Sequence, residues 1–250
     1  LDQNQILLVL DQTPFYAESG GQIGDVGTIQ GDDIKLEVLD VTKAGDTFIH
    51  ICTGTIDIKT DGKVRCEVDN SRRQNIKKNH TATHLMHRAL KMVLGDHVHQ
   101  AGSLVHSDYL RFDLTHFEKL STDQIIDIEK IVNGEIQSNT ELDVTVKAFD
   151  EAKKEGATAM FGEKYGDTVC VVSFGNDSVE FCGGTHVDNA GVIGNFIITK
   201  ESGVSAGVRR IEAICGEAAY LHLKDLQAEI NSAKEIVKNR DLDAGILKLQ

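Results

Sequence analysis

The sequence predicts an α+β protein with three parts: a small N-terminal β-barrel, a mixed α+β core and a C-terminal helix. Three observations support this. Short alternating apolar runs separated by glycines fill residues 6–70, helical and strand patterns then mix without a regular βαβ repeat, and only helical spacing remains after residue 216. We therefore expect segments at 1–70, 71–216 and 217–250.

The N-terminal segment is predicted to be all-β. Its candidate strands are short, many of them alternate apolar and polar residues, and glycines lie between them. Several short strands at this spacing favour a small barrel. The predicted strands cover residues 6–10, 26–29, 34–41, 47–51 and 64–68.

The middle segment is predicted to begin with a helix. From about residue 75, apolar residues recur at helical spacing, and Gly95 supplies a stop signal. A second helix is expected after Ser121, which can form a capping box with Gln124. Predicted strands in this segment cover residues 109–114, 142–148, 168–174, 178–182, 192–199 and 208–214.

The C-terminal segment is predicted to be helical. After Gly216, apolar residues alternate at spacings of three and four, with an interruption at Arg240, which is typical of a helix that presents a seam. The chain starts at Leu1, which is not a methionine, and stops at Gln250 within this pattern. We therefore expect a fragment of a longer protein.

The charge balance limits the partners of this chain. There are 26 Lys and Arg against 39 Asp and Glu, a formal net charge of −13, and so acidic a protein is a poor general binder of nucleic acid. Residues 70–95 are the exception, because they contain no Asp or Glu. A solvated helix face is the ordinary explanation, and local contact with RNA is the alternative. The cations we assign to such contact are Arg72, Arg73, Lys77 and Lys78.

The cysteines and the apolar runs indicate the compartment. Five scattered cysteines, an odd number, argue against a disulfide framework and for reduced thiols. No apolar run approaches the roughly 20 residues that a membrane-spanning helix needs, and the N-terminus lacks a signal-peptide pattern. We expect a cytoplasmic protein without a membrane partner.

Two short motifs predict a metal site. His80 and His84 are four residues apart, which places both imidazoles on one helix face about 6 Å apart. Cys182 and His186 lie far downstream on a glycine-rich turn. Each motif by itself is more often an ordinary polar surface. Together they offer three nitrogens and one thiolate, a donor set that suits Zn²⁺ far better than Mg²⁺ or Ca²⁺.

The motifs leave the role of the zinc open. Four protein ligands ordinarily close a structural site, whereas a catalytic site keeps one position for water or substrate. Residues 81–83 lack the glutamate of an HExxH motif, so an ordinary metallopeptidase is excluded.

Two further groups are candidate phosphate contacts. Gly20, Gly21 and Gln22 form a glycine turn that either lets backbone N–H groups approach a phosphate or simply connects two strands. Arg209 and Arg210 are adjacent on a predicted strand and point to opposite faces. One of the two guanidiniums could contact phosphate while the other makes a structural ion pair.

At these residues the chain resembles the editing region of the alanyl-tRNA synthetase family. The resemblance runs from about residue 6 to residue 216 and is specific because its motifs are long. Two departures are Cys170, where we expect arginine, and Phe181, where we expect leucine. The matching stretches are residues 10–25, 79–85, 100–105, 110–113, 161–167, 180–186 and 207–213.

The resemblance implies a deacylase that removes serine or glycine wrongly attached to alanine tRNA. It implies zinc ligands at His80, His84, Cys182 and His186, a glycine motif at Gly20, Gly21 and Gln22, and a residue needed for editing at Gln100. It further implies three partners: the tRNA acceptor end, the rest of the synthetase chain, and a second copy through the C-terminal segment of the full-length protein. Aminoacylation is not expected from this fragment.

An editing site answers a physical need. A pocket sized for alanine cannot exclude glycine by sterics and rejects an added hydroxyl by only about 100-fold, so a second hydrolytic site is warranted. We predict that Gln100 and Thr81 help to sense the serine hydroxyl. Two alternatives stay open: a structural zinc module that binds tRNA without turnover, and a free-standing trans-editing deacylase.

Overall fold

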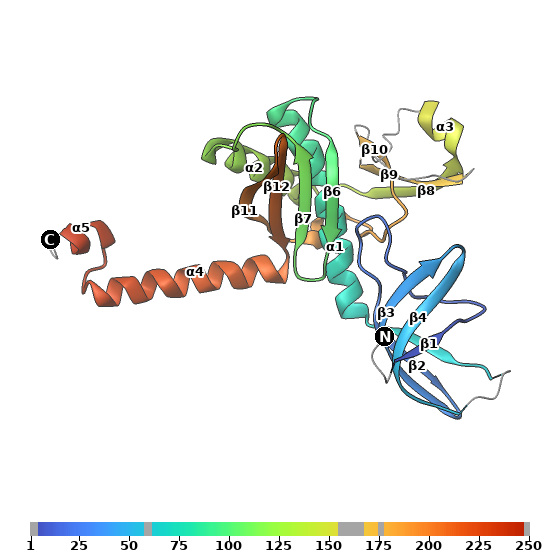
Figure 1. Cartoon of the computed structure of the whole chain (residues 1–250). Helices are drawn as coiled ribbons and strands as arrows, with labels where there is room; N and C mark the ends of the chain where they lie inside the picture. The colour runs from blue at the N-terminus through green and yellow to red at the C-terminus, as the bar shows by residue number, and fades with distance from the viewer. Residues whose placement is uncertain (1–4, 58–61, 155–167, 175–177, 248–250) are drawn as a thin grey trace.

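The computed structural model describes residues 5–57, 62–154, 168–174 and 178–247, and it confirms an α+β fold. Three sheets and five α-helices are present in these residues (Figure 1). The motif predicted at residues 161–167 lies outside the described residues.

The N-terminal segment is a five-stranded antiparallel sheet. Its spatial order is β1-β4-β3-β2-β5. Alternate residues of these strands, such as Ile29, Leu36 and Val38, face one apolar cluster. The strands are β1 (Ile6–Leu8), β2 (Gly27–Gly31), β3 (Ile34–Ala44), β4 (Thr47–Ile56) and β5 (Arg65–Val68).

The predicted closure of this sheet into a barrel was wrong for the described residues. β1 and β5 are the two edges, and no pairing joins them there. The alternation correctly predicted strands with one buried face, but it carries no information about which edges pair.

Helix α1 (Asn70–Leu94) leads from the sheet into the core (Figure 1). It begins five residues earlier than predicted, because the Asp69 side chain accepts a hydrogen bond from the Arg72 amide and caps it. It ends at Gly95, as predicted, where φ is 109°.

The core is a four-stranded antiparallel sheet against which α1 and α2 (Thr122–Ser138) pack. α2 begins with the predicted capping box of Ser121 and Gln124. The sheet order is β11-β12-β7-β6, with β6 (Gln100–Val105), β7 (Leu110–Thr115), β11 (Phe196–Ser205) and β12 (Val208–Cys215).

Two parts of this sheet differ from the prediction. β6 was not predicted, because its sequence QAGSLV contains little apolar alternation. The predicted strand at 192–199 begins only at Phe196, since a 3₁₀ turn, η1 (Ala190–Ile193), precedes it.

A third, smaller sheet adjoins the core. Its order is β10-β9-β8, formed by β8 (Leu142–Ala148), β9 (Thr168–Phe174) and β10 (Ser178–Phe181), and the short helix α3 (Phe149–Lys154) follows β8. The strands predicted at 142–148 and 168–174 are confirmed.

The C-terminal helix α4 (Glu217–Ile236) extends away from the core, and α5 (Leu242–Leu247) follows it (Figure 1). The gap between them contains Arg240, where the interruption was predicted. Among the described helices, none combines the length and the apolar character needed to span a membrane.

Candidate metal centre

Helix α1 supplies the first two candidate ligands. His80 and His84 are one helical turn apart, both are buried, and their rings stack with centroids 5.2 Å apart. The helix enters the core at this point, so both rings are shielded from bulk solvent.

The segment after β10 supplies the other two. The amide of Cys182 donates to the carbonyl of Cys170 at 3.0 Å, which continues the β9–β10 pairing by one residue. His186 lies one tight turn later. Only glycine fits at position 184 of this turn, because a Cβ atom there would overlap the His80 ring and lie 2.8 Å from Oε1 of Gln22.

The four side chains converge. Their ligand atoms all lie within 4.8 Å of one another, and Nε2 of His80 and of His186 are each 3.3 Å from Sγ of Cys182. Around a tetrahedral ion with bonds of 2.0–2.3 Å, neighbouring ligand atoms are about 3.5 Å apart. The quartet could therefore hold one metal ion with little rearrangement.

The remaining ring nitrogens are fixed by neighbouring side chains. Nδ1 of His80 donates to Oε1 of Gln22 at 2.7 Å, and Nδ1 of His84 donates to Glu180 at 2.5 Å. Nδ1 of His186 lies 3.3 Å from Oγ1 of Thr81. This is the outer shell expected of metal-bound histidines, because an engaged Nδ1 leaves Nε2 as the ligand atom.

Burial and charge oppose each other in this cluster. Burial disfavours the Cys182 thiolate, but the charges of His80 and His84 outweigh it and hold the pKa of Cys182 well below its usual range. Burial likewise opposes the His84 cation, yet Cys182 and Glu180 raise its pKa to about 10. Burial and the neighbouring His80 lower the pKa of His186 to about 4. A metal ion needs the thiolate together with neutral imidazoles, so the proton on His84 must leave when an ion binds.

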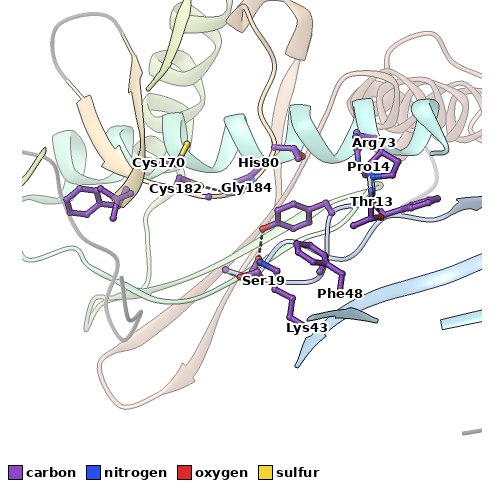
Figure 2. A pocket seen from close by; sticks show the side chains of 18 of the residues that line it. Thr13, Pro14, Ser19, Lys43, Phe48, Arg73, His80, Cys170, Cys182 and Gly184 are labelled. Atoms are coloured by element: carbon purple, nitrogen blue, oxygen red, sulfur yellow. Dashed lines mark hydrogen bonds between the residues drawn. The ribbon is translucent and has the colours of Figure 1, made fainter. Parts of the chain in front are cut away.

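Two of the candidate ligands, His80 and Cys182, border a cavity of about 670 Å³ (Figure 2). His80, Cys182 and Gly184 lie along one wall, and Ser19, Lys43 and Phe48 of the N-terminal segment lie along the other. The cavity is thus formed between the sheet and the core, and two of the four ligands are part of its lining.

The glycine turn joins these two regions. Gly21 has φ 81°, and a Cβ atom there would lie 2.6 Å from the Ser103 carbonyl oxygen of β6. Its own carbonyl accepts from the Val105 amide at 2.7 Å, while Gly20 lines the cavity. Gln22 is completely buried and bonds to His80 and to Thr185. The turn therefore serves tertiary contact, and Gln22 orients a ligand.

The two predicted catalytic residues, Thr81 and Gln100, are not among the described residues that line the cavity. The hydroxyl of Thr81 accepts from the Val187 amide at 3.2 Å and faces His186, so it positions a ligand. Gln100 begins β6, whose other end meets Gln22 through Val105, about 17 Å away at 3.3 Å per residue. It is not among the described residues that line the cavity, and its role stays a prediction.

Two of the four cations predicted on α1 hold the regions together. Arg72 donates to the carbonyl of Gly24 at 2.7 Å, and Arg73 pairs with the buried carboxylate of Asp25. Arg73 also reaches the cavity. Lys78 lies near Gly216, and Lys77 is half-exposed on the same helix. RNA contact by these four residues stays a prediction.

Arg209 and Arg210 both make ion pairs. Arg209 lies 2.5 Å from Glu201, and Arg210 binds Asp113 through two bonds of 2.7 and 2.8 Å. The sequence predicted such a pair for one of the two. Phosphate contact by the other stays a prediction, although its guanidinium is engaged with a carboxylate.

Glu180 contacts a candidate metal ligand and was not predicted from the sequence. It is buried, and its carboxylate binds His84 and lies 3.4 Å from Nδ1 of His87. It precedes Cys182 by two residues along an extended strand, so both side chains belong to one face. That spacing was the available signal.

Two family models match the chain. The model described as tRNA synthetases class II (A) matches residues 1–72, which include the N-terminal sheet. The model described as threonyl and alanyl tRNA synthetase second additional domain matches residues 169–212, which include Cys182 and His186.

Curated relatives match almost the whole chain. Alanine–tRNA ligase of Pseudoalteromonas translucida is 47% identical over 95% of this chain, that of a Thermoanaerobacter species is 48% identical over 95%, and that of a Sulfurovum species is 49% identical over 97%. The chain spans 27–28% of the length of these relatives. In the segment that it spans, the chain belongs to the alanyl-tRNA synthetase family.

Proposed function

We propose that this segment edits mischarged tRNA: it hydrolyses the ester that links serine or glycine to alanine tRNA, at a zinc ion held by His80, His84, Cys182 and His186. The observation that carries the proposal is that two members of this buried quartet, His80 and Cys182, line the wall of a cavity. A purely structural site needs no such opening. The partners of this proposal are the acceptor end of alanine tRNA and the rest of the synthetase chain, in the cytoplasm.

The donor set supports zinc. Three imidazole nitrogens and one thiolate match the nitrogen and sulfur ligands of tetrahedral Zn²⁺, and the 3.3 Å spacings between Sγ and each Nε2 fit its bond lengths. A zinc ion bound there supplies positive charge that polarises an ester carbonyl or a nearby water.

The protein residues have separate tasks in this proposal. Gln22, Glu180 and Thr81 hold the three imidazoles in orientation through their Nδ1 atoms. The glycines at positions 183 and 184 keep that wall of the cavity free of side chains, so a substrate can approach His80 and Cys182 closely. Arg73, which is partly exposed at the cavity, offers a cation to the RNA backbone.

The test is hydrolysis of seryl- and alanyl-tRNA for alanine by the purified chain, beside its Cys182→Ala variant, with zinc assayed in both. We expect release of serine but not of alanine, and loss of both activity and bound zinc in the variant. Serine release that persists in a zinc-free variant would contradict the zinc site.

A structural zinc module is the second candidate. It is favoured by one observation: the quartet already supplies four protein ligands, which is the number that closes a tetrahedral site. This alternative predicts stoichiometric zinc, metal-dependent stability and no release of either amino acid.

A further inference from the structure

The end of the β3–β4 hairpin reaches the metal cavity. A register shift between Val38 and Asp40 places a bulge in β3, and such bulges bend a strand. Beyond it, β3 and β4 pair as far as Ala44 and Thr47. In Figure 1 the hairpin turns upward toward the sheet of β8, β9 and β10. Its end and the segment after β10 both line the cavity.

The hairpin presents one aromatic ring and one cation there. Lys43 and Phe48 are cross-strand partners, and Nζ of Lys43 lies 4.4 Å from the centroid of the Phe48 ring. Lys43 is exposed, whereas Phe48 is half-buried against the apolar cluster of the sheet. The apolar cluster therefore holds the ring in place, and both Phe48 and Lys43 line the cavity (Figure 2).

A second ring is fixed beside them. Tyr16 lines the same cavity, its amide donates to Asp25 at 2.6 Å, and its hydroxyl donates to the Ser19 carbonyl at 3.1 Å. Four lining residues, Phe15, Tyr16, Phe48 and Phe181, are aromatic, a class that makes up 5% of the chain. Of these, Tyr16 and Phe48 belong to the N-terminal segment and are the two that are not fully buried.

The charge of the lining is unlike that of the chain. The protein carries 39 carboxylates and a net charge of −13, yet no Asp or Glu is among the described residues that line this cavity. Two cationic side chains, Lys43 and Arg73, do line it. A cavity with aromatic rings, cations and no carboxylates matches a ligand that has a flat ring system and a phosphate.

We propose that Phe48 and Tyr16 form a stacking wall for the base of the terminal nucleotide, and that Lys43 binds its 5′-phosphate. The inference rests on the proposed function, because it places the terminal adenosine so that its ester faces His80 and Cys182. It goes further in giving the N-terminal sheet a direct part in substrate recognition. The ligand class is a purine nucleotide, free or at an RNA end.

Calorimetric titration with adenosine 5′-monophosphate tests the wall without any hydrolysis. Phe48→Leu keeps an apolar side chain for the sheet but removes the ring, and we expect it to weaken nucleotide binding about 5- to 150-fold, the range for one stacked base. Lys43→Gln should abolish the preference of the wild type for the monophosphate over adenosine, about 2- to 5-fold for an exposed ion pair.

Matched substitutions control for non-specific effects. Phe117→Leu changes an 86% exposed ring in the loop after β7, and Lys35→Gln changes an exposed lysine at the start of β3, and neither residue lines the cavity. Both variants should bind the nucleotide as the wild type does. An unchanged affinity in Phe48→Leu, or no binding by the wild type, would overturn the inference.

A second titration separates the two sources of nucleotide. Removing the terminal adenosine from uncharged alanine tRNA should weaken binding to the wild type but not to Phe48→Leu. Equal losses in both proteins would show that the RNA end does not occupy this wall. Nucleotide binding that depends on Phe48 in a chain that releases no serine would contradict the proposed function and leave the stacking wall in place.

Discussion

The N-terminal sheet and the core bury different kinds of side chain. The centre of the sheet is an apolar cluster that includes Ile29, Leu36, Val38 and Val41. The core has a larger apolar cluster, but a polar group is buried beside it. The members of that group are Asn79, His80, Thr81, Thr83, His84, His87, Glu180 and His186.

This difference separates stability from function. Burying a polar side chain costs free energy unless hydrogen bonds or a ligand compensate that cost. The stability of the core therefore depends on what these buried polar residues bind. The polar side chains buried in the N-terminal segment, Gln22, Asp25 and His50, all have protein hydrogen-bond partners, so this segment needs no ligand and can act as a fixed platform. The comparison predicts that perturbations of the metal site will affect the core and spare the sheet.

Metal removal should have the largest effect. At a free metal concentration 1,000 times the Kd, binding stabilises the folded state by about 4 kcal/mol, equivalent to about 8–16 °C in Tm for a chain of this size. Hydrogen exchange with and without chelator should show lost protection in α1 and β10 but not in β2 or β3. Equal loss in both regions would show that the two unfold as one unit.

Gly184→Ala should have the next largest effect. The new methyl group would overlap the His80 ring, which Gln22 already fixes, so we expect a loss of about 3 kcal/mol in the free energy of unfolding together with impaired metal binding. Gly183→Ala is the matched control, because no atom lies within 4 Å of the position that its methyl group would take. Denaturant titration and metal analysis of both variants decide the point.

Gln22 tests the link between the two regions. Gln22→Met keeps the volume but removes the acceptor for Nδ1 of His80, and we expect metal affinity to fall about 10- to 100-fold. Gln22→Glu keeps an acceptor and should restore the affinity. Competition with a chelator measures this, and the visible spectrum of the Co²⁺-substituted protein reports the ligand geometry. A spectrum and affinity unchanged in Gln22→Met would show that the sheet does not orient His80.

The smallest expected effect is a pH dependence of stability that arises from His50 in the N-terminal sheet. His50 is completely buried, and burial lowers its pKa from 6.5, although a bond to the Leu8 carbonyl partly opposes this. The unfolded chain therefore binds a proton more readily, so stability is lost as the pH falls below 6.5.

We expect Tm to fall by a few degrees between pH 7.5 and pH 5.5, and His50→Gln to reduce that fall. His99→Gln changes an exposed histidine and should leave the pH dependence as it is. An identical slope in His50→Gln and the wild type would remove His50 as the source.

The sequence predicted most of the local structure and the four side chains that converge at the candidate metal centre. Spacing of four placed His80 and His84 on one helix face, and the capping residues marked where α2 begins. These features depend on neighbours along the chain, and periodicity reports such neighbours well.

The sequence did not predict contacts that join distant segments. Gln22 was predicted in a turn that either approaches a phosphate or connects two strands, and its bond to His80, 58 positions away, was not predicted. The open edges of the first sheet and the carboxylate partners of both Arg209 and Arg210 are of the same kind. The sequence around each of these residues is compatible with either a substrate contact or an internal contact, because tertiary packing determines which partner the side chain meets.

The distance between the two ligand pairs also has a consequence for synthesis. Cys182 follows His80 by 102 positions. At about 5–20 residues per second, the ribosome needs about 5–20 s to complete the second pair after the first has emerged. During that interval the N-terminal sheet has all its strands and can fold, whereas α1 displays two histidines without their thiolate. At the proposed zinc site, metal binding would therefore come late in synthesis, after the N-terminal sheet has already formed.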